Sequence, residues 1–204
     1  MIKAIFFDMG GVLLPLHLDR SIEAYRNIAG FKDIDNYLDP CHQSGFFLDL
    51  EAGRISLDEF MTECQKHCAP GTTRETIIDC HNHFFGTPAP DDVALVKELS
   101  KKYDFFMLSN NNALSMILHR PNFANAGLPL DTSFKKMFLS HEMKLLKPDP
   151  EIYRQAIAGS GYKADECLFI DDSQKNVDGA LAVGMHAVLL PAGASLREVV
   201  EANL

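Results

Sequence analysis

The segment AIFFDMGGVLL, residues 4–14, places an aspartate where an apolar run ends and two glycines follow. A short run without polar residues is typical of a strand that is covered on both faces in a parallel sheet. Asp8 leaves this strand as the chain enters a loop. Gly10 and Gly11 allow the main chain to bend sharply and to come close to an anion. The segment therefore predicts a buried strand that presents a carboxylate to a ligand.

Four later segments resemble this strand, and helical patterns separate most of them. The strand-like runs are DFFML at 104–108, KMFL at 136–139, CLFI at 167–170 and HAVLL at 186–190. The helical patterns cover 91–103, 150–158 with Asp149 as its N-cap, and 176–183, and a capping-box sequence at 195–198 opens the last helix. This alternation predicts an α/β fold, a Rossmann-like doubly wound parallel sheet.

The stretch between the first strand and residue 91 departs from the alternation, because helix follows helix. Amphipathic patterns at 18–29 and 43–52 each end before a glycine, and the capping-box sequences 56–59 and 72–75 each precede an apolar stripe. Such a helical insertion, roughly seventy residues, is too long for an ordinary crossover. We therefore expect an all-helical cap at 16–86, inserted into a core formed by residues 1–15 and 87–204.

The composition narrows the class of protein and of partner. The chain has 204 residues, 47% of them apolar and 23% charged, which suits a globular protein with one sizeable core. A net charge of −9 argues against a nucleic-acid partner, which requires a basic surface. Without a secretory signal or a membrane-spanning run, we expect no membrane partner. Five cysteines, an odd number, then indicate reduced thiols and a cytoplasmic protein.

Polar residues follow four of the predicted strands, at the sheet edge where open α/β sheets bind ligands. They are Asp8, Ser109 with Asn110, Lys147 a few residues past its strand, and Asp171 with Asp172. Carboxylates suit Mg²⁺, a lysine offsets phosphate charge, and hydroxyl and main-chain N–H groups donate to phosphate oxygens. Asp8 is then placed to attack phosphorus and form an aspartyl-phosphate that water hydrolyses, while Asp8 and Asp172 hold the metal.

Four segments that carry these residues resemble the ordered motifs of the haloacid dehalogenase superfamily. They are FFDMGGVL (6–13), MLSNNN (107–112), KLLKPDPEIY (144–153) and FIDDSQKNVDGA (169–180). Each motif is short, but four in this order at strand ends are specific, and they span nearly the whole chain. The resemblance implies a Rossmann-like core with a cap inserted after the first motif. It also implies a Mg²⁺-dependent phosphatase for a small phosphorylated metabolite, similar to sugar-phosphate phosphatases of the glucose-1-phosphatase type.

The resemblance also implies a role for each matching residue. Asp8 is the nucleophile, and the Gly10 carbonyl and Asp172 are metal ligands, which Asp171 supports or joins. The residues that bind the transferring phosphoryl group are Met9, Gly10, Ser109, Asn110 and Lys147.

One position departs from the family pattern. Many phosphatases of the family have an aspartate two residues after the nucleophile, which protonates the leaving group and later activates water, but here that residue is Gly10. General acid–base assistance contributes about 10²–10⁴ in rate and phosphate-ester enzymes reach accelerations of about 10²¹, so catalysis can survive without it. The loss of this acid should slow hydrolysis least for substrates that have good leaving groups. We therefore hypothesise a sugar 1-phosphate as substrate.

Two other functions stay open on these residues. Asp8 is also the residue with which a metal-independent 2-haloacid dehalogenase would attack carbon, although such an enzyme does not need the pair of Asp171 and Asp172. The second alternative is a catalytically dead family member that binds a phosphorylated ligand or a protein, and Gly10 is the feature that supports it.

Several residues of the expected cap have two interpretations. His17, His42 and Arg54 could face the substrate, although such residues are more often at the surface. Phe46 and Phe47 are expected in the cap core, and the stretch 46–54 in the specificity surface. The cysteines and histidines between residues 64 and 83 lack the spacing of metal ligands, which favours core and surface positions. Neither the physiological substrate nor the oligomeric state follows from the sequence.

Overall fold

The computed structural model describes residues 1–38 and 43–204 and contains the predicted parallel sheet. Its strands run in the order β3-β2-β1-β4-β5, and every pairing is parallel. They are β1 (Ala4–Phe7), β2 (Asp104–Ser109), β3 (Lys136–Leu139), β4 (Cys167–Asp171) and β5 (His186–Leu189). Each lies within one residue of a predicted run, and the predicted fold class is confirmed.

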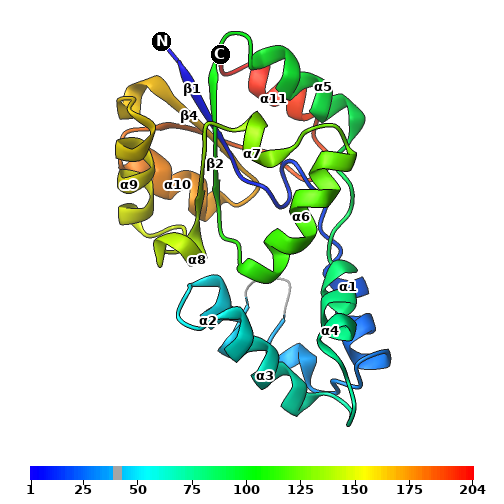
Figure 1. The fold of residues 1–204 in the computed structure, drawn as a ribbon. Coiled ribbons are helices and arrows are strands. Elements are labelled where there is room, and N and C mark those ends of the chain that lie inside the picture. Colours follow the sequence, from blue (N-terminus) through cyan, green and yellow to red (C-terminus); the bar gives the residue numbers. More distant parts are fainter. Residues whose placement is uncertain (39–42) are drawn as a thin grey trace.

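Helices cover both faces of the sheet (Figure 1). Alternate strand residues point to opposite faces, so each face contributes to a separate apolar core. Phe7 and Phe105 share one apolar core with α5 (Pro90–Leu99), α6 (Ala113–Asn125) and α11 (Leu196–Glu201). Phe6 and Phe106 share the other with α9 (Pro150–Ser160) and α10 (Gln174–Ala182). Burial on both faces explains why the strands show no alternation of polar and apolar residues.

The loops after the strands contain shorter elements and specific helix caps. The short elements are α7 (Leu130–Ser133), α8 (Ser140–Met143) and the 3₁₀ turns η1 (Ile34–Asn36) and η2 (Ala164–Glu166). Asp149 caps α9 as predicted, since its side chain accepts a hydrogen bond from the Glu151 N–H at 2.8 Å. Asn112 caps α6, which leaves Ser109 free of that task. No helix in the described ranges has the length and apolarity needed to cross a membrane.

Four helices between β1 and α5 pack around an apolar core of their own. They are α1 (Leu18–Asn27), α2 (Gly45–Glu51), α3 (Leu57–His67) and α4 (Arg74–Asn82). This core contains Tyr25, Phe47 and Phe60, and Leu114 of α6 reaches into it from the sheet domain. Figure 1 shows the four helices together at the end of the molecule opposite to both termini. We call this group of helices, residues 16–86, the helical unit.

Two caps in the helical unit test the capping-box predictions. Ser56 and Glu59 form the predicted box at the start of α3, with a bond from the Glu59 N–H to the Ser56 hydroxyl and one from the Ser56 N–H to the Glu59 carboxylate. The second prediction was wrong by one residue, because Thr73 rather than Thr72 caps α4. The Thr72 hydroxyl donates instead to the Ala69 carbonyl at 2.8 Å, which keeps Thr72 in the preceding turn.

Parallel pairing brings the carboxyl ends of β1, β2 and β4 to one edge of the sheet. The chain adds β2 and β3 on one side of β1 and then crosses to place β4 on the other side. This reversal of direction is the position at which open α/β sheets form a ligand crevice. The residues that follow β1 and β4, Asp8 and Asp172, therefore lie at the same end of the sheet, which faces the helical unit (Figure 1).

Replacement of Leu114 by alanine tests how firmly α6 is packed into the helical unit. Leu114 has no exposed surface, so we expect the free energy of unfolding to fall by about 2–5 kcal/mol, the usual range for a buried leucine. Ile117→Ala on the same helix is the matched control, because Ile117 is 49% exposed and should change stability little. Denaturant titration measures both, and equal losses would contradict this packing.

Candidate active site

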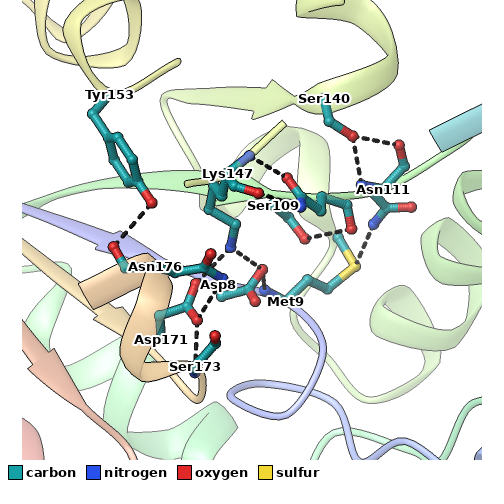
Figure 2. A network of polar contacts seen from close by, with 11 residues as sticks. Asp8, Met9, Ser109, Asn111, Ser140, Lys147, Tyr153, Asp171, Ser173 and Asn176 are labelled. Carbon is teal, nitrogen blue, oxygen red and sulfur yellow. Dashed lines mark hydrogen bonds and ion pairs between the residues drawn. The ribbon is translucent and has the colours of Figure 1, made fainter. Parts of the chain in front are cut away.

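A buried ion-pair network links the ends of β1 and β4 (Figure 2). The Lys147 ammonium lies 3.1 Å from Oδ1 of Asp8 and 2.6 Å from Oδ2 of Asp171. The side chains of Lys147 and Asp171 have no exposed surface, and that of Asp8 is 12% exposed. Buried charges require partners, and here each carboxylate finds one in the same ammonium.

The two neighbouring aspartates after β4 are placed very differently. Asp171 is held at both oxygens, since Oδ1 accepts from the Ser173 N–H at 2.8 Å and from the Asn176 amide at 2.9 Å, while Oδ2 binds Lys147. Asp172 is exposed, and its carboxylate packs against Gly11. A Cβ at Gly11 would lie 1.9 Å from the Asp172 Oδ2 atom, and Gly11 has a φ of 72°. Glycine is therefore required there for both the turn and the close approach.

The three aspartates form an oxygen-rich cluster with an excess of negative charge. Asp8, Asp171 and Asp172 each offer a carboxylate oxygen, and these atoms lie within 4.8 Å of one another. Burial raises the pKa of Asp8 to about 7, which Lys147 opposes and Asp171 reinforces. Burial and Asp171 also raise the pKa of Asp172. One ammonium does not balance three carboxylates, and hard oxygen donors in this arrangement fit a divalent cation such as Mg²⁺.

Lys147 keeps its charge in this buried position. Burial alone would lower its pKa, but Asp8 and Asp171 outweigh burial and raise the pKa above its ordinary value. Asn110, after β2, fixes the main chain of Lys147 at two points: its amide oxygen accepts from the Lys147 N–H at 2.8 Å and its amide nitrogen donates to the Lys147 carbonyl at 3.1 Å. The Asn110 side chain is thus engaged in positioning the lysine.

The other predicted phosphate-binding residues surround Asp8. Ser109 is buried, and its hydroxyl donates to the Asn110 carbonyl at 3.4 Å. The influence of this hydroxyl on Asp8 counteracts the rise in the pKa of that carboxyl. The Met9 N–H donates to Oδ1 of Asp8 at 2.7 Å, and the Met9 side chain is buried against the Asn111 amide. Gly10 follows and lines a cavity beside these groups. The structure thus brings all eight predicted site residues to one edge of the sheet.

Most of the substrate-facing candidates from the helical unit lie away from this cluster. Arg54 pairs with Asp49 at 2.6 Å, with 53% of its side chain exposed. Phe46 and Phe47 are buried in the core of the helical unit, as expected. Cys64 and Cys80 are buried there as free thiols. His17 is half-buried next to Gly86, and His42 lies outside the described residues.

A cavity of about 140 Å³ opens beside the cluster and contains two residues that the sequence analysis did not name. Gly10, Ser109 and Asn110 line it together with Glu51 of α2 and His119 of α6. Burial, with His81, lowers the pKa of His119 to about 3, so its ring is neutral. Within the described ranges, the His119 Nδ1 atom is buried without a hydrogen-bond partner. Glu51 falls in the stretch expected to form the specificity surface, but nothing in the sequence marked His119.

Comparison with known proteins gives the family. A family model described as haloacid dehalogenase-like hydrolase matches residues 2–184, and the chain belongs to this family. D-ribitol-5-phosphate phosphatase of Bacteroides thetaiotaomicron is 33% identical over 199 residues, which cover 97% of this chain and 96% of that protein.

Solved structures agree over the whole length. A haloacid dehalogenase family enzyme of Bacteroides thetaiotaomicron, in complex with magnesium and inorganic phosphate, has a TM-score of 0.92 and 29% identity, covering 98% of this chain and 99% of that one. A HAD-like family hydrolase of Porphyromonas gingivalis has a TM-score of 0.90 and 35% identity, covering 100% of this chain and 98% of that one.

Replacement of Lys147 by methionine tests the buried network. Methionine keeps much of the side-chain volume but leaves Asp8 and Asp171 without a cation, so we expect a loss of about 3–5 kcal/mol in the free energy of unfolding. Lys135→Met is the matched control, because Lys135 pairs with Asp104 at the surface, with 62% of its side chain exposed, and surface pairs contribute little. Denaturant titration without divalent metal compares the two, and a Lys147→Met protein as stable as the control would contradict the assignment.

Proposed function

We propose that this protein is a Mg²⁺-dependent phosphatase that hydrolyses a small phosphorylated metabolite of the sugar or polyol class through an aspartyl-phosphate on Asp8. The observation that carries the proposal is the meeting of Asp8, Lys147 and the aspartates after β4 around one point at the sheet edge. Family membership supports it, as do a relative named for phosphatase activity and a similar structure that contains magnesium and phosphate.

The residues that would hold the metal are Asp8, Asp172 and the Gly10 carbonyl. The carboxylate of Asp171 is already held by Lys147, Ser173 and Asn176. Its main task is therefore to fix the lysine, and it is the least available of the candidate metal ligands. When bound, the metal supplies positive charge that neutralises the repulsion between a phosphate and the attacking carboxylate.

The chain's own groups then account for the transfer. Asp8 presents a carboxylate oxygen at the end of a rigid buried strand, which holds the nucleophile in a fixed position for attack on phosphorus. Lys147 balances phosphate charge, and the Ser109 hydroxyl with the main-chain N–H groups of Gly10 and Asn110 are the proposed donors to the remaining phosphate oxygens. The helical unit is the proposed cap, which covers the substrate and excludes water during transfer.

The cavity beside the strand ends supports a small and polar substrate. A volume of about 140 Å³ beside Asp8 leaves room for a short chain of hydroxylated carbons. His119 lines the cavity with a neutral ring, which suits an uncharged polyol chain. A relative named D-ribitol-5-phosphate phosphatase favours a phosphate on a primary alcohol, whereas Gly10 favours a better leaving group such as an anomeric oxygen.

The rival functions make different demands on the site. A 2-haloacid dehalogenase attacks carbon without a metal and has no use for the exposed Asp172 carboxylate against Gly11. A catalytically dead member that binds a ligand would not need Asp8 as a nucleophile. Metal dependence and the effect of Asp8→Asn therefore separate all three.

Removal of the metal and of the nucleophile tests the proposed function directly. We expect phosphate release from 4-nitrophenyl phosphate to require Mg²⁺, to stop on addition of EDTA and to return when Mg²⁺ is restored in excess. Asp8→Asn should reduce the rate to background, since the amide is not a nucleophile. Activity that persists in EDTA, or that is equal in both proteins, would rule out this mechanism.

The leaving group can be tested with three phosphorylated compounds. If the missing acid at Gly10 is not replaced, turnover should be clearly faster with glucose 1-phosphate than with glucose 6-phosphate, because the anomeric oxygen leaves more easily. If another residue protonates the leaving oxygen, glucose 6-phosphate and D-ribitol 5-phosphate should be turned over as well as or better than the 1-phosphate. Values of kcat for the three substrates, measured at saturating concentration, distinguish these outcomes.

A further inference from the structure

Glu51, the last residue of α2, lines the same cavity as the residues at the strand ends. It shares the cavity with Gly10, Ser109 and Asn110. The charges of Asp8 and Lys147 both influence the pKa of its carboxyl group. A residue of the helical unit with a carboxyl group therefore borders the space beside the proposed nucleophile, although it is distant from Asp8 in the sequence.

The main chain at Glu51 is fixed to the sheet domain. Ser140, the first residue of α8, donates its hydroxyl hydrogen to the Glu51 carbonyl oxygen at 2.7 Å and accepts from the Asn111 N–H at 2.9 Å. Figure 2 shows this serine beside Asn111, in the loop that follows Ser109. Gly53 then packs so closely on α8 that a Cβ would lie 2.1 Å from the His141 carbonyl oxygen. These contacts hold the end of α2 next to the loop after β2.

The surroundings of Glu51 keep its carboxyl able to exchange a proton near neutral pH. Burial and the charge of Asp8 raise its pKa to about 7, against the opposite effect of Lys147. The other ionisable groups nearby are His119, which is neutral and lines the same cavity, and His141 on α8, which contacts the Asn111 carbonyl at 2.9 Å. Helix α3 packs on α2 through an apolar contact, in which the Phe60 ring meets the rings of Phe46 and Phe47. A proton donor is most effective when its pKa lies near the working pH.

Gly10 leaves open the position that an aspartate occupies in many relatives. Its φ is not in the left-handed region, so a side chain is compatible with the main chain there. The nearest atoms to an added Cβ all belong to the Leu16 side chain, at 2.9 Å for Cδ1, and Leu16 lines the same cavity. Gly10, which lacks a carboxyl group, and Glu51, which has one, therefore line the same cavity.

We propose that Glu51 is the general acid–base residue of this enzyme, contributed by the helical unit in place of the absent carboxyl at position 10; the proposal rests on the phosphatase function. In the first step an Asp8 oxygen bonds to phosphorus, the bond to the leaving oxygen breaks, and Glu51 passes its proton to that oxygen. In the second step water bonds to phosphorus, the bond to Asp8 breaks, and the Glu51 carboxylate takes the proton from water. Both carboxyl groups return to their starting states, and the ester and water become alcohol and inorganic phosphate.

Glu51→Gln is the decisive variant, because the amide keeps the size of the side chain and cannot donate an acidic proton. With D-ribitol 5-phosphate, whose leaving group is a strongly basic alkoxide, kcat should fall by about 10²–10⁴, the usual contribution of general acid–base catalysis. With 4-nitrophenyl phosphate, whose leaving group needs no proton, the first step should persist. Rapid mixing should then show a burst of about one equivalent of nitrophenolate followed by slow turnover, because hydrolysis of the intermediate still lacks its base.

Glu63→Gln is the matched control on α3. Glu63 also belongs to the helical unit, but it pairs with Lys66 at the surface, away from the cavity, and its loss should leave both substrates unaffected. The pH profile gives a second readout. The kcat/KM of the wild-type enzyme for the alkyl phosphate should fall above the pKa of Glu51, and Glu51→Gln should lose this basic limb.

A second pair of variants keeps the proposal testable if removal of Glu51 disturbs the fold. Gly10→Asp in the Glu51→Gln background returns a carboxyl to the same space and should recover at least tenfold of the lost kcat with D-ribitol 5-phosphate. Gly10→Ala in that background adds the same Cβ without an acid and should recover nothing. Equal behaviour of these two double variants would overturn the proposal.

The outcomes separate this inference from the proposed function. If Glu51→Gln retains the wild-type kcat with D-ribitol 5-phosphate while Asp8→Asn is inactive, the phosphatase function stands and the role of Glu51 is wrong. If Glu51→Gln slows both substrates equally and shows no burst, its role is structural and the proposal fails. If the wild-type enzyme itself releases no phosphate in the presence of Mg²⁺, the proposed function fails first.

Discussion

The buried ammonium of Lys147 between Asp8 and Asp171 is the interaction on which the site depends. It joins the ends of the two central strands, which come from opposite ends of the chain, and it does so where water is excluded. An unpaired carboxylate at either position would carry the full cost of burial. The rest of the local structure serves this arrangement: Asn110 clamps the lysine main chain, and Ser173 and Asn176 hold the second oxygen of Asp171.

The same network leaves the site unbalanced in charge, and this imbalance explains its chemistry. Three carboxylates meet one ammonium. Burial, reinforced by Asp171, raises the pKa values of Asp8 and Asp172, and the charges of Asp8 and Asp171 raise that of Lys147. A divalent cation relieves the excess and at the same time prepares the cluster to accept a dianionic phosphate. The cluster also has a steric requirement at Gly11, because the Asp172 carboxylate occupies the place where a side chain at position 11 would be.

The helical unit contributes a wall of the cavity through Glu51, and we propose that it also covers the substrate. Its last residue on α2 is anchored through Ser140, and Leu114 of α6 is packed in its core, so contacts run in both directions between the two parts. This mutual packing fixes the position of Glu51 relative to the strand ends.

Local sequence patterns were sufficient for the strands, for most helix starts and for the residues at strand ends. Apolar runs of four to six residues and capping sequences act over a few neighbouring positions, so Asp8, Lys147 and Asp171 could be named and assigned to one edge. The α4 cap failed by one residue, because Thr72 and Thr73 offer the same hydroxyl and only the contact with Ala69 decides between them.

The tertiary structure alone decided which polar groups share a space. The Asn110 side chain fixes Lys147, a task that the sequence did not indicate. His119 lines the cavity without any signal in its neighbourhood, and Glu51 was covered only by the broad expectation for residues 46–54. The reason is physical: strand and helix patterns depend on neighbouring residues, whereas burial, charge and a pKa near neutrality depend on residues that are distant in the chain and meet only after folding.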